Sequence, residues 1–103
     1  MSGFDAQACY NGAQAIETAR DFRPHVCIVD LNMPGIAGDE VARRILAQPS
    51  DIPPLMIAVT AMSGELYRVL TKMAGFQIHL VKPVELRELI RAIETHGRWP
   101  TRA

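Results

Sequence analysis

Short apolar runs rich in β-branched residues alternate along this chain with stretches whose apolar residues recur at helical spacing. The runs cover residues 4–10, 25–29, 55–59 and 78–81, and a helical stretch follows each of them. Apolar runs of this length between turn signals predict strands, and strand–helix alternation predicts a parallel sheet covered by helices. The run at 25–29 is continuously apolar, so we expect a strand buried on both faces. The run at 55–59 predicts another buried strand. The expected order is therefore four strands and four helices.

The helical stretches are marked by their apolar spacing and by their punctuation. The first should end at Arg23, because the residue before Pro24 is disfavoured in helical conformation. The third should end at Gly75, since glycine is common just after a helix. The apolar positions of the four helices, in chain order, are Ala15, Ile16, Ala19 and Phe22; Val41, Ile45 and Leu46; Leu66, Val69, Leu70 and Met73; and Leu86, Leu89, Ile90 and Ile93.

Length and charge exclude several classes of protein. With 103 residues the chain has room for one domain, which we place at 1–97 with a tail at 98–103. Eleven basic and eleven acidic residues give no net charge, so nothing indicates binding to nucleic acid or to an anionic membrane. No apolar run has the roughly 20 residues of a membrane span, and no signal peptide is visible. Two cysteines form no disulfide framework, which favours a cytoplasmic location.

Polar residues follow three of the predicted strands at the point where each strand ends. Asp30, Thr60 and Lys82 occupy these positions. In a parallel sheet with right-handed crossovers the strand ends share one edge, which is where ligands bind in open α/β sheets. A carboxylate can attack phosphorus to form an acyl phosphate, an ammonium can bind phosphoryl oxygens, and a hydroxyl can hydrogen-bond to them. Each residue alone is ordinary as a turn former, a cap or a solvated charge, but the three together indicate a site.

The segments around these residues resemble the receiver domain of two-component response regulators. They read VDLNMPG at 29–35, VTA at 59–61 and LVKP at 80–83, in matching order and strand context across about 4–95. The resemblance implies a flavodoxin-like, doubly wound parallel sheet of the α/β class, and a phosphorylation-controlled switch rather than an enzyme. It also implies that a histidine kinase or a histidine phosphotransfer protein is the phosphoryl donor.

The same resemblance implies roles for individual residues. Asp30 would accept the phosphoryl group, Lys82 would bind it, and the small Ala61 would leave room for it. Thr60 would move toward the group as the switch residue. The backbone carbonyl of Asn32 would help Asp30 to hold Mg²⁺.

Two further positions follow from the resemblance. His79 stands where the family carries its aromatic switch residue. The bond between Lys82 and Pro83 would be cis, a state that proline makes accessible.

The front of the chain departs from the family pattern. The strand expected at 4–10 aligns with the second strand of the family, so the first strand and its helix have no counterpart, and neither does the acidic pair that helps to bind Mg²⁺. Magnesium prefers near-octahedral oxygen ligands, so metal binding and self-phosphorylation are in question. The alternative hypothesis is a degenerate interaction module, independent of phosphorylation, or a truncated fragment. An uncovered sheet face also favours a longer natural product or a homo-oligomer.

Overall fold

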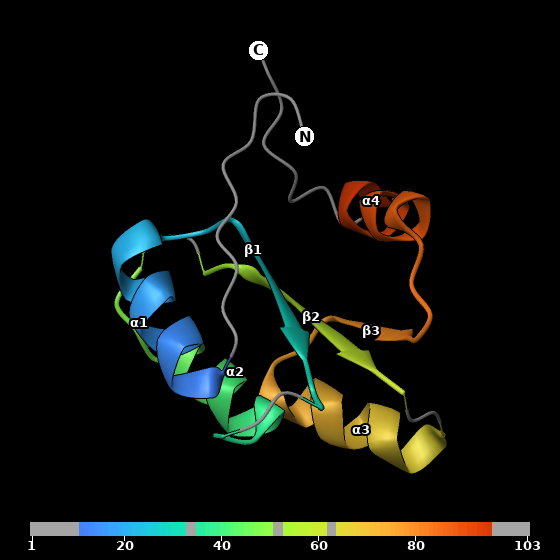
Figure 1. Cartoon of the computed structure of the whole chain (residues 1–103), viewed down its shortest axis with the longest axis horizontal. Helices are drawn as coiled ribbons and strands as arrows, with labels where there is room; N and C mark the ends of the chain where they lie inside the picture. The colour runs from blue at the N-terminus through green and yellow to red at the C-terminus, as the bar shows by residue number, and fades with distance from the viewer. Residues whose placement is uncertain (1–10, 33–34, 51–52, 62–63, 96–103) are drawn as a thin grey trace.

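The computed structural model describes residues 11–32, 35–50, 53–61 and 64–95, which form a parallel three-stranded sheet and four helices (Figure 1). The strand order is β1-β2-β3, and the elements alternate along the chain as expected. The strand predicted at 4–10 and the tail at 98–103 lie outside the described residues. The elements are α1 (Gly12–Phe22), β1 (Val26–Asp30), α2 (Gly38–Leu46), β2 (Leu55–Thr60), α3 (Glu65–Ala74), β3 (Ile78–Val81) and α4 (Leu86–Thr95).

Local signals set the ends of α1. The Asn11 side chain accepts a hydrogen bond of 2.9 Å from the backbone N–H of Gln14, which satisfies a donor that the first turn leaves free. The helix ends before Arg23, whose backbone is left-handed with φ 53°. The end predicted from Arg23 and Pro24 is therefore confirmed.

The sheet carries helices on both faces, and β2 is its buried centre. Leu55, Met56, Ile57 and Ala58 are all fully buried, which confirms the prediction for this strand. Alternate residues point to opposite faces. Met56 and Ala58 join the core under α1 and α2, whereas Leu55 and Ile57 pack against Ile93 of α4.

The prediction that the strand at 25–29 is buried on both faces is wrong at Ile28, whose side chain is 49% exposed. Ile28 pairs with Ile57 in register and therefore faces the α4 side of the sheet. In the described part of the chain, α4 packs over the Leu55–Ile57 core but does not bury Ile28. Leu86 of α4 is 62% exposed as well. We call the surface formed by Ile28, Leu86 and Ile90 the open face.

The apolar stripe of α3 faces solvent and not the core. A stripe with this spacing normally faces the core. Here Thr71 and Ala74 are the buried residues of α3, whereas the stripe residues are exposed. The helix is rotated so that two small side chains, the polar Thr71 and the apolar Ala74, face the core. The stripe residues are Leu66, Val69, Leu70 and Met73.

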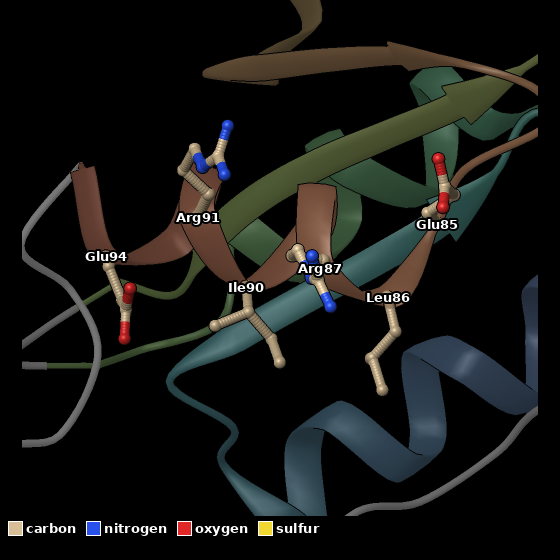
Figure 2. A pocket seen from close by; sticks show the side chains of 6 residues that line it. All are labelled: Glu85, Leu86, Arg87, Ile90, Arg91 and Glu94. Carbon is tan, nitrogen blue, oxygen red and sulfur yellow. The ribbon is translucent and has the colours of Figure 1, made fainter.

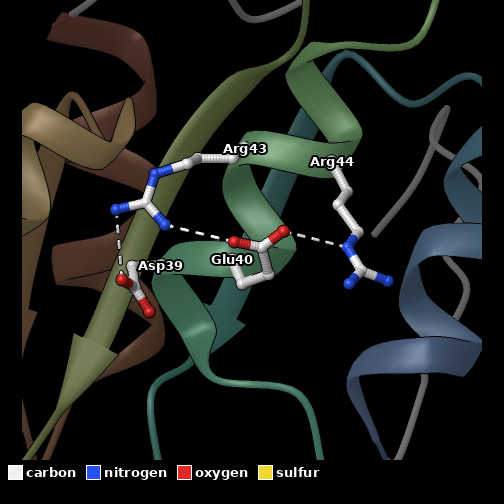
Figure 3. A network of polar contacts seen from close by, with 4 residues as sticks. All are labelled: Asp39, Glu40, Arg43 and Arg44. Carbon is white, nitrogen blue, oxygen red and sulfur yellow. Dashed lines mark hydrogen bonds and ion pairs between the residues drawn. The ribbon is translucent and has the colours of Figure 1, made fainter.

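The outer side of α2 carries a network of exposed charges (Figure 3). Glu40 accepts from Arg44 at 3.0 Å and from Arg43 at 3.3 Å, and Arg43 also pairs with Asp39 at 3.2 Å. The hydrogen bond from Arg44 lowers the pKa of the Glu40 carboxyl. Exposed ion pairs three and four residues apart stabilise a helix only weakly. We therefore assign this network to the local stability of α2.

Replacing Gly75 with alanine is expected to destabilise the fold by about 1–3 kcal/mol. The backbone of Gly75 has φ 111°, and an added Cβ would overlap Cδ1 of Leu46. Gly64→Ala is the matched control, because Gly64 has φ 131° but open space around its Cβ position. Urea unfolding of both variants separates backbone strain from steric overlap. Equal losses of unfolding free energy in the two variants would show that the overlap with Leu46 adds nothing to the cost of backbone strain.

Candidate functional site

The three polar residues predicted at the strand ends lie on one edge of the sheet. Asp30 ends β1, Thr60 ends β2, and Lys82 follows β3. Backbone hydrogen bonds of 2.8 Å continue the strand pairing past these ends, from Leu31 to the carbonyl of Val59 and from Lys82 to the carbonyl of Thr60. The Lys82–Pro83 bond is cis, as the resemblance implies.

Asp30 and Lys82 form the centre of the site. The Lys82 Nζ donates to Asp30 Oδ2 at 2.8 Å, and the Asn32 backbone N–H donates to Oδ1 at 2.8 Å. The hydrogen bond from Lys82 holds the pKa of the Asp30 carboxyl below its usual value, and the Asn32 N–H adds to this. Both side chains remain open to solvent, with 47% of Asp30 and 38% of Lys82 exposed. The site thus presents an accessible carboxylate with a cation beside it.

Replacing Lys82 with methionine is expected to raise the pKa of Asp30, because the variant removes the largest cause of its lowering. A lowered folded-state pKa adds stability above the unfolded-state pKa, and this is lost as pH falls through the folded-state value. The contribution is modest because the pair is exposed. Carbon-detected NMR titration of the Asp30 carboxyl measures the shift, with Lys72→Met as the control. An unchanged Asp30 pKa in Lys82→Met would contradict the assigned pairing.

The backbone after β1 is tied to the backbone after β2. The Asn32 Oδ1 accepts a hydrogen bond of 3.4 Å from the backbone N–H of Ala61, and Ala61 is exposed as its predicted role requires. Thr60 is fully buried. The family resemblance implies a role for Asn32 only through its backbone carbonyl, so this side-chain contact was not predicted. No local pattern signals this contact, because its partner Ala61 is 29 residues away in the sequence.

His79 does not reach the Asp30 site. It lies on β3 and packs against α3, where its Nδ1 is 3.4 Å from Thr71 Oγ1 and its ring stands edge-on to Tyr67 at 5.8 Å. The Thr71 hydroxyl also donates to the carbonyl of Arg68 at 3.0 Å. Its Nε2 is buried without a hydrogen-bond partner in the described part of the chain. His79 therefore connects β3 to α3.

The residues at this edge fit Mg²⁺ in part. The Asp30 carboxylate and the Asn32 carbonyl are hard oxygen ligands of the kind that Mg²⁺ takes, with water filling further positions. Across residues 11–32, 35–50, 53–61 and 64–95, no three His, Cys, Asp or Glu side chains gather as a metal cluster. A bound ion would therefore hold mostly water or phosphoryl oxygens.

A surface pocket lies away from the strand ends, along α4 (Figure 2). Leu86 and Ile90 project from the same side of the helix there, among charged residues. The pocket shares no residue with the Asp30 site and belongs to the open face. It is lined by Glu85, Leu86, Arg87, Ile90, Arg91 and Glu94.

Among the described helices, none is long and apolar enough to cross a bilayer.

Known proteins share both the sequence and the fold. A family model described as the response regulator receiver domain matches residues 1–94. The transcriptional regulatory protein PrrA of Mycobacterium leprae is 33% identical over 94 residues, covering 91% of this chain and 40% of that protein. The DNA-binding response regulator MtrA of Mycolicibacterium paratuberculosis is 31% identical over 96 residues, covering 93% and 41%. The chain thus spans about 40% of the length of these curated relatives.

A solved structure agrees in fold. The receiver domain of a sensor histidine kinase from Pseudomonas aeruginosa PAO1, with a magnesium ion coordinated in its active-site cleft, is 28% identical with a TM-score of 0.78. The match covers 90% of this chain and 76% of that one. The predicted α/β receiver fold is therefore confirmed. With the family model covering most of the sequence, the chain belongs to the response regulator receiver domain family of two-component systems.

Proposed function

We propose that Asp30 is the phosphoacceptor of this receiver domain. A carboxylate oxygen attacks phosphorus, the phosphorus–nitrogen bond of a donor phosphohistidine breaks, and its electron pair leaves with the imidazole. The 2.8 Å contact between Lys82 Nζ and Asp30 Oδ2 carries the proposal, because it places a cation where the phosphoryl oxygens arrive. The donor is a histidine kinase or a histidine phosphotransfer protein.

The proposal assigns the neighbouring residues to sensing the phosphoryl group. Thr60, buried beside the site, supplies the hydroxyl that moves toward it, while Ala61 leaves the approach open. Lys82 shares its backbone contact with Thr60, so a shift at Thr60 moves the end of β3. His79 carries that shift to α3 through Thr71.

We infer that the Asp30 carboxylate and the Asn32 carbonyl would hold Mg²⁺, which would neutralise charge at the phosphoryl group. The domain acts as a phosphoacceptor switch rather than as an enzyme. We place the domain in the cytoplasm, in keeping with a sequence whose two cysteines form no disulfide framework. A second copy covering the open face stays a prediction.

A magnesium titration followed by NMR separates this function from a degenerate interaction module. Amide signals around Asp30 and Asn32 are expected to shift with Mg²⁺ and not with the same concentration of K⁺. Asp30→Asn should abolish these shifts, whereas Asp39→Asn, an exposed change on α2, should preserve them. Shifts that stay the same in Asp30→Asn would place the ion elsewhere and contradict the proposal.

A further inference from the structure

Strand β1 has one neighbour in the described part of the chain. It pairs with β2, and the described sheet ends on its other side. The N–H of Leu31, just past β1, donates to the carbonyl of Val59 in β2. Alternate residues of a paired strand bond to the same neighbour, so the odd-numbered residues of β1 bond to β2. The backbone groups of Val26, Ile28 and Asp30 therefore point the other way, toward what we call the free edge.

The free edge has none of the features that keep a strand edge open in native proteins. Such edges are protected by charged residues, prolines or bulges, or they are covered. The segment Val26–Val29 contains no charged residue and no proline, and its pairing with β2 is regular. We therefore expect a covering strand along the free edge.

Helix α1 indicates on which side of β1 the strand before it lies. Ala19 of α1 shares one core with residues of α2 and α3, so these three helices cover the same face of the sheet, opposite α4 (Figure 1). The connections through α2 and α3 step from β1 to β2 and from β2 to β3. Crossovers between parallel strands are right-handed, so a connection through α1 on this face steps in the same direction. A strand that precedes α1 therefore lies on the side of the free edge.

The start of α1 indicates the direction of that strand. A Cβ added at Gly35, in the loop after β1, would lie 3.8 Å from the Cβ of Asn11, the N-cap of α1. Helix α1 therefore begins at the carboxyl end of β1, and it returns to the amino end of β1 through Arg23. A strand that leads directly into Asn11 ends where β1 ends, so it runs parallel to β1.

Residues 4–10 directly precede Asn11, and their sequence fits the free edge. Alternating apolar and polar residues predict a strand with one apolar face. The free edge is asymmetric in the same way, because Ile16 of α1 packs against the core on one face of the sheet and Ile28 is exposed on the other. Seven extended residues span about 23 Å, enough to follow all of β1. The alternating sets are Phe4, Ala6, Ala8 and Tyr10, and Asp5, Gln7 and Cys9.

We propose that residues 4–10 form a strand that pairs in parallel with β1 along the free edge. The sheet then has the order 4–10, β1, β2, β3. In the flavodoxin-like order 2-1-3-4-5, the first strand separates the strands that match 4–10 and β1, and here the two are direct neighbours. The backbone of Asp30 is thereby held between two strands. The pairing does not depend on the phosphoacceptor role proposed for Asp30.

Amide hydrogen exchange followed by NMR tests whether a strand of the same chain covers the free edge. The amides of Cys27 and Val29 point toward β2 and provide the reference for a paired strand. The amide of Ile28 points to the free edge and is expected to exchange as slowly as these at every protein concentration. Fast exchange at Ile28 would show an open edge, and protection that grows with concentration would show that a second copy covers it. Either result would overturn the proposal.

Proline variants test whether residues 4–10 are the covering strand. Proline lacks an N–H, and neighbouring N–H groups in a strand point in opposite directions, so one of Gln7→Pro and Ala8→Pro removes a donor to β1. That variant should speed exchange at Ile28 about tenfold or more, while slow exchange at Val29 shows that the rest of the sheet is intact. Ser2→Pro, before the segment, is the control and should leave Ile28 unchanged. Slow exchange at Ile28 in both Gln7→Pro and Ala8→Pro would assign the cover to another segment and overturn the proposal.

Cross-strand nuclear Overhauser effects test the direction of the pairing. In a parallel pair, the contacts of Val26 fall earlier within residues 4–10 than the contacts of Asp30 do. Mixing labelled and unlabelled chains separates contacts within one chain from contacts between copies. The reverse order of contacts would contradict the parallel direction.

Discussion

Replacing Asp30 with asparagine is expected to reduce phosphoryl uptake to below about one percent of the wild-type rate. The amide keeps the size of the side chain but lacks the anionic oxygen that attacks phosphorus. The fold should survive, because the Asp30 side chain is 47% exposed and lies outside the buried core. The ion pair with Lys82 is lost with the charge.

Transfer of radiolabelled phosphate from a phosphorylated histidine phosphotransfer protein measures this loss. Asp39→Asn is the matched control, because Asp39 is an exposed aspartate on α2 paired with Arg43. It should accept phosphate like the wild type. Uptake that persists in Asp30→Asn, or that falls equally in Asp39→Asn, would remove Asp30 from the role of acceptor.

Replacing Ile57 with alanine is expected to lower the free energy of unfolding by about 2–5 kcal/mol. Ile57 is fully buried at the centre of β2, in the cluster that it forms with Leu55 and Ile93. A cavity there removes contacts between the sheet and α4, and small domains have little stability to spare.

Ile28→Ala provides the control for this variant. Ile28 is the in-register neighbour of Ile57 on β1, and the two side chains share a face of the sheet, but Ile28 is 49% exposed. Its loss should cost about 1 kcal/mol or less. Urea unfolding of the two variants compares the same chemical change at a covered and an open position. Equal losses would mean that α4 does not protect the centre of this face.

The sequence predicted what local pattern and strand direction determine. A run of apolar residues marked β2 as a buried strand, and the position of Asp30, Thr60 and Lys82 after their strands was enough to place them on one edge. Contacts between residues far apart in the sequence were harder to predict. The departure at the front of the chain predicts an uncovered sheet face, but not that Ile28 lies on it in the described part of the chain, because that depends on where α4 lies.

The apolar pattern of α3 does not decide whether its stripe faces the core or solvent. Leu66, Val69, Leu70 and Met73 mark one side of a helix, but the spacing alone does not say which surface that side meets. Thr71 on the inner side bonds to His79, a contact that satisfies two polar groups at the helix–sheet junction. The periodicity of apolar residues takes no account of such a polar pair. The i, i+4 spacing of Tyr67 and Thr71 could have marked the inner side of α3.

The intact mass of the chain after incubation with acetyl phosphate, with and without Mg²⁺, tests the central claim most directly. Asp30 attacks phosphorus, the bond from phosphorus to the acetyl oxygen breaks, and acetate leaves. We expect a gain of one phosphoryl group that requires Mg²⁺ and disappears in Asp30→Asn. No gain at any magnesium concentration, in a chain shown to be folded, would contradict the assignment of a working phosphoacceptor site to these residues.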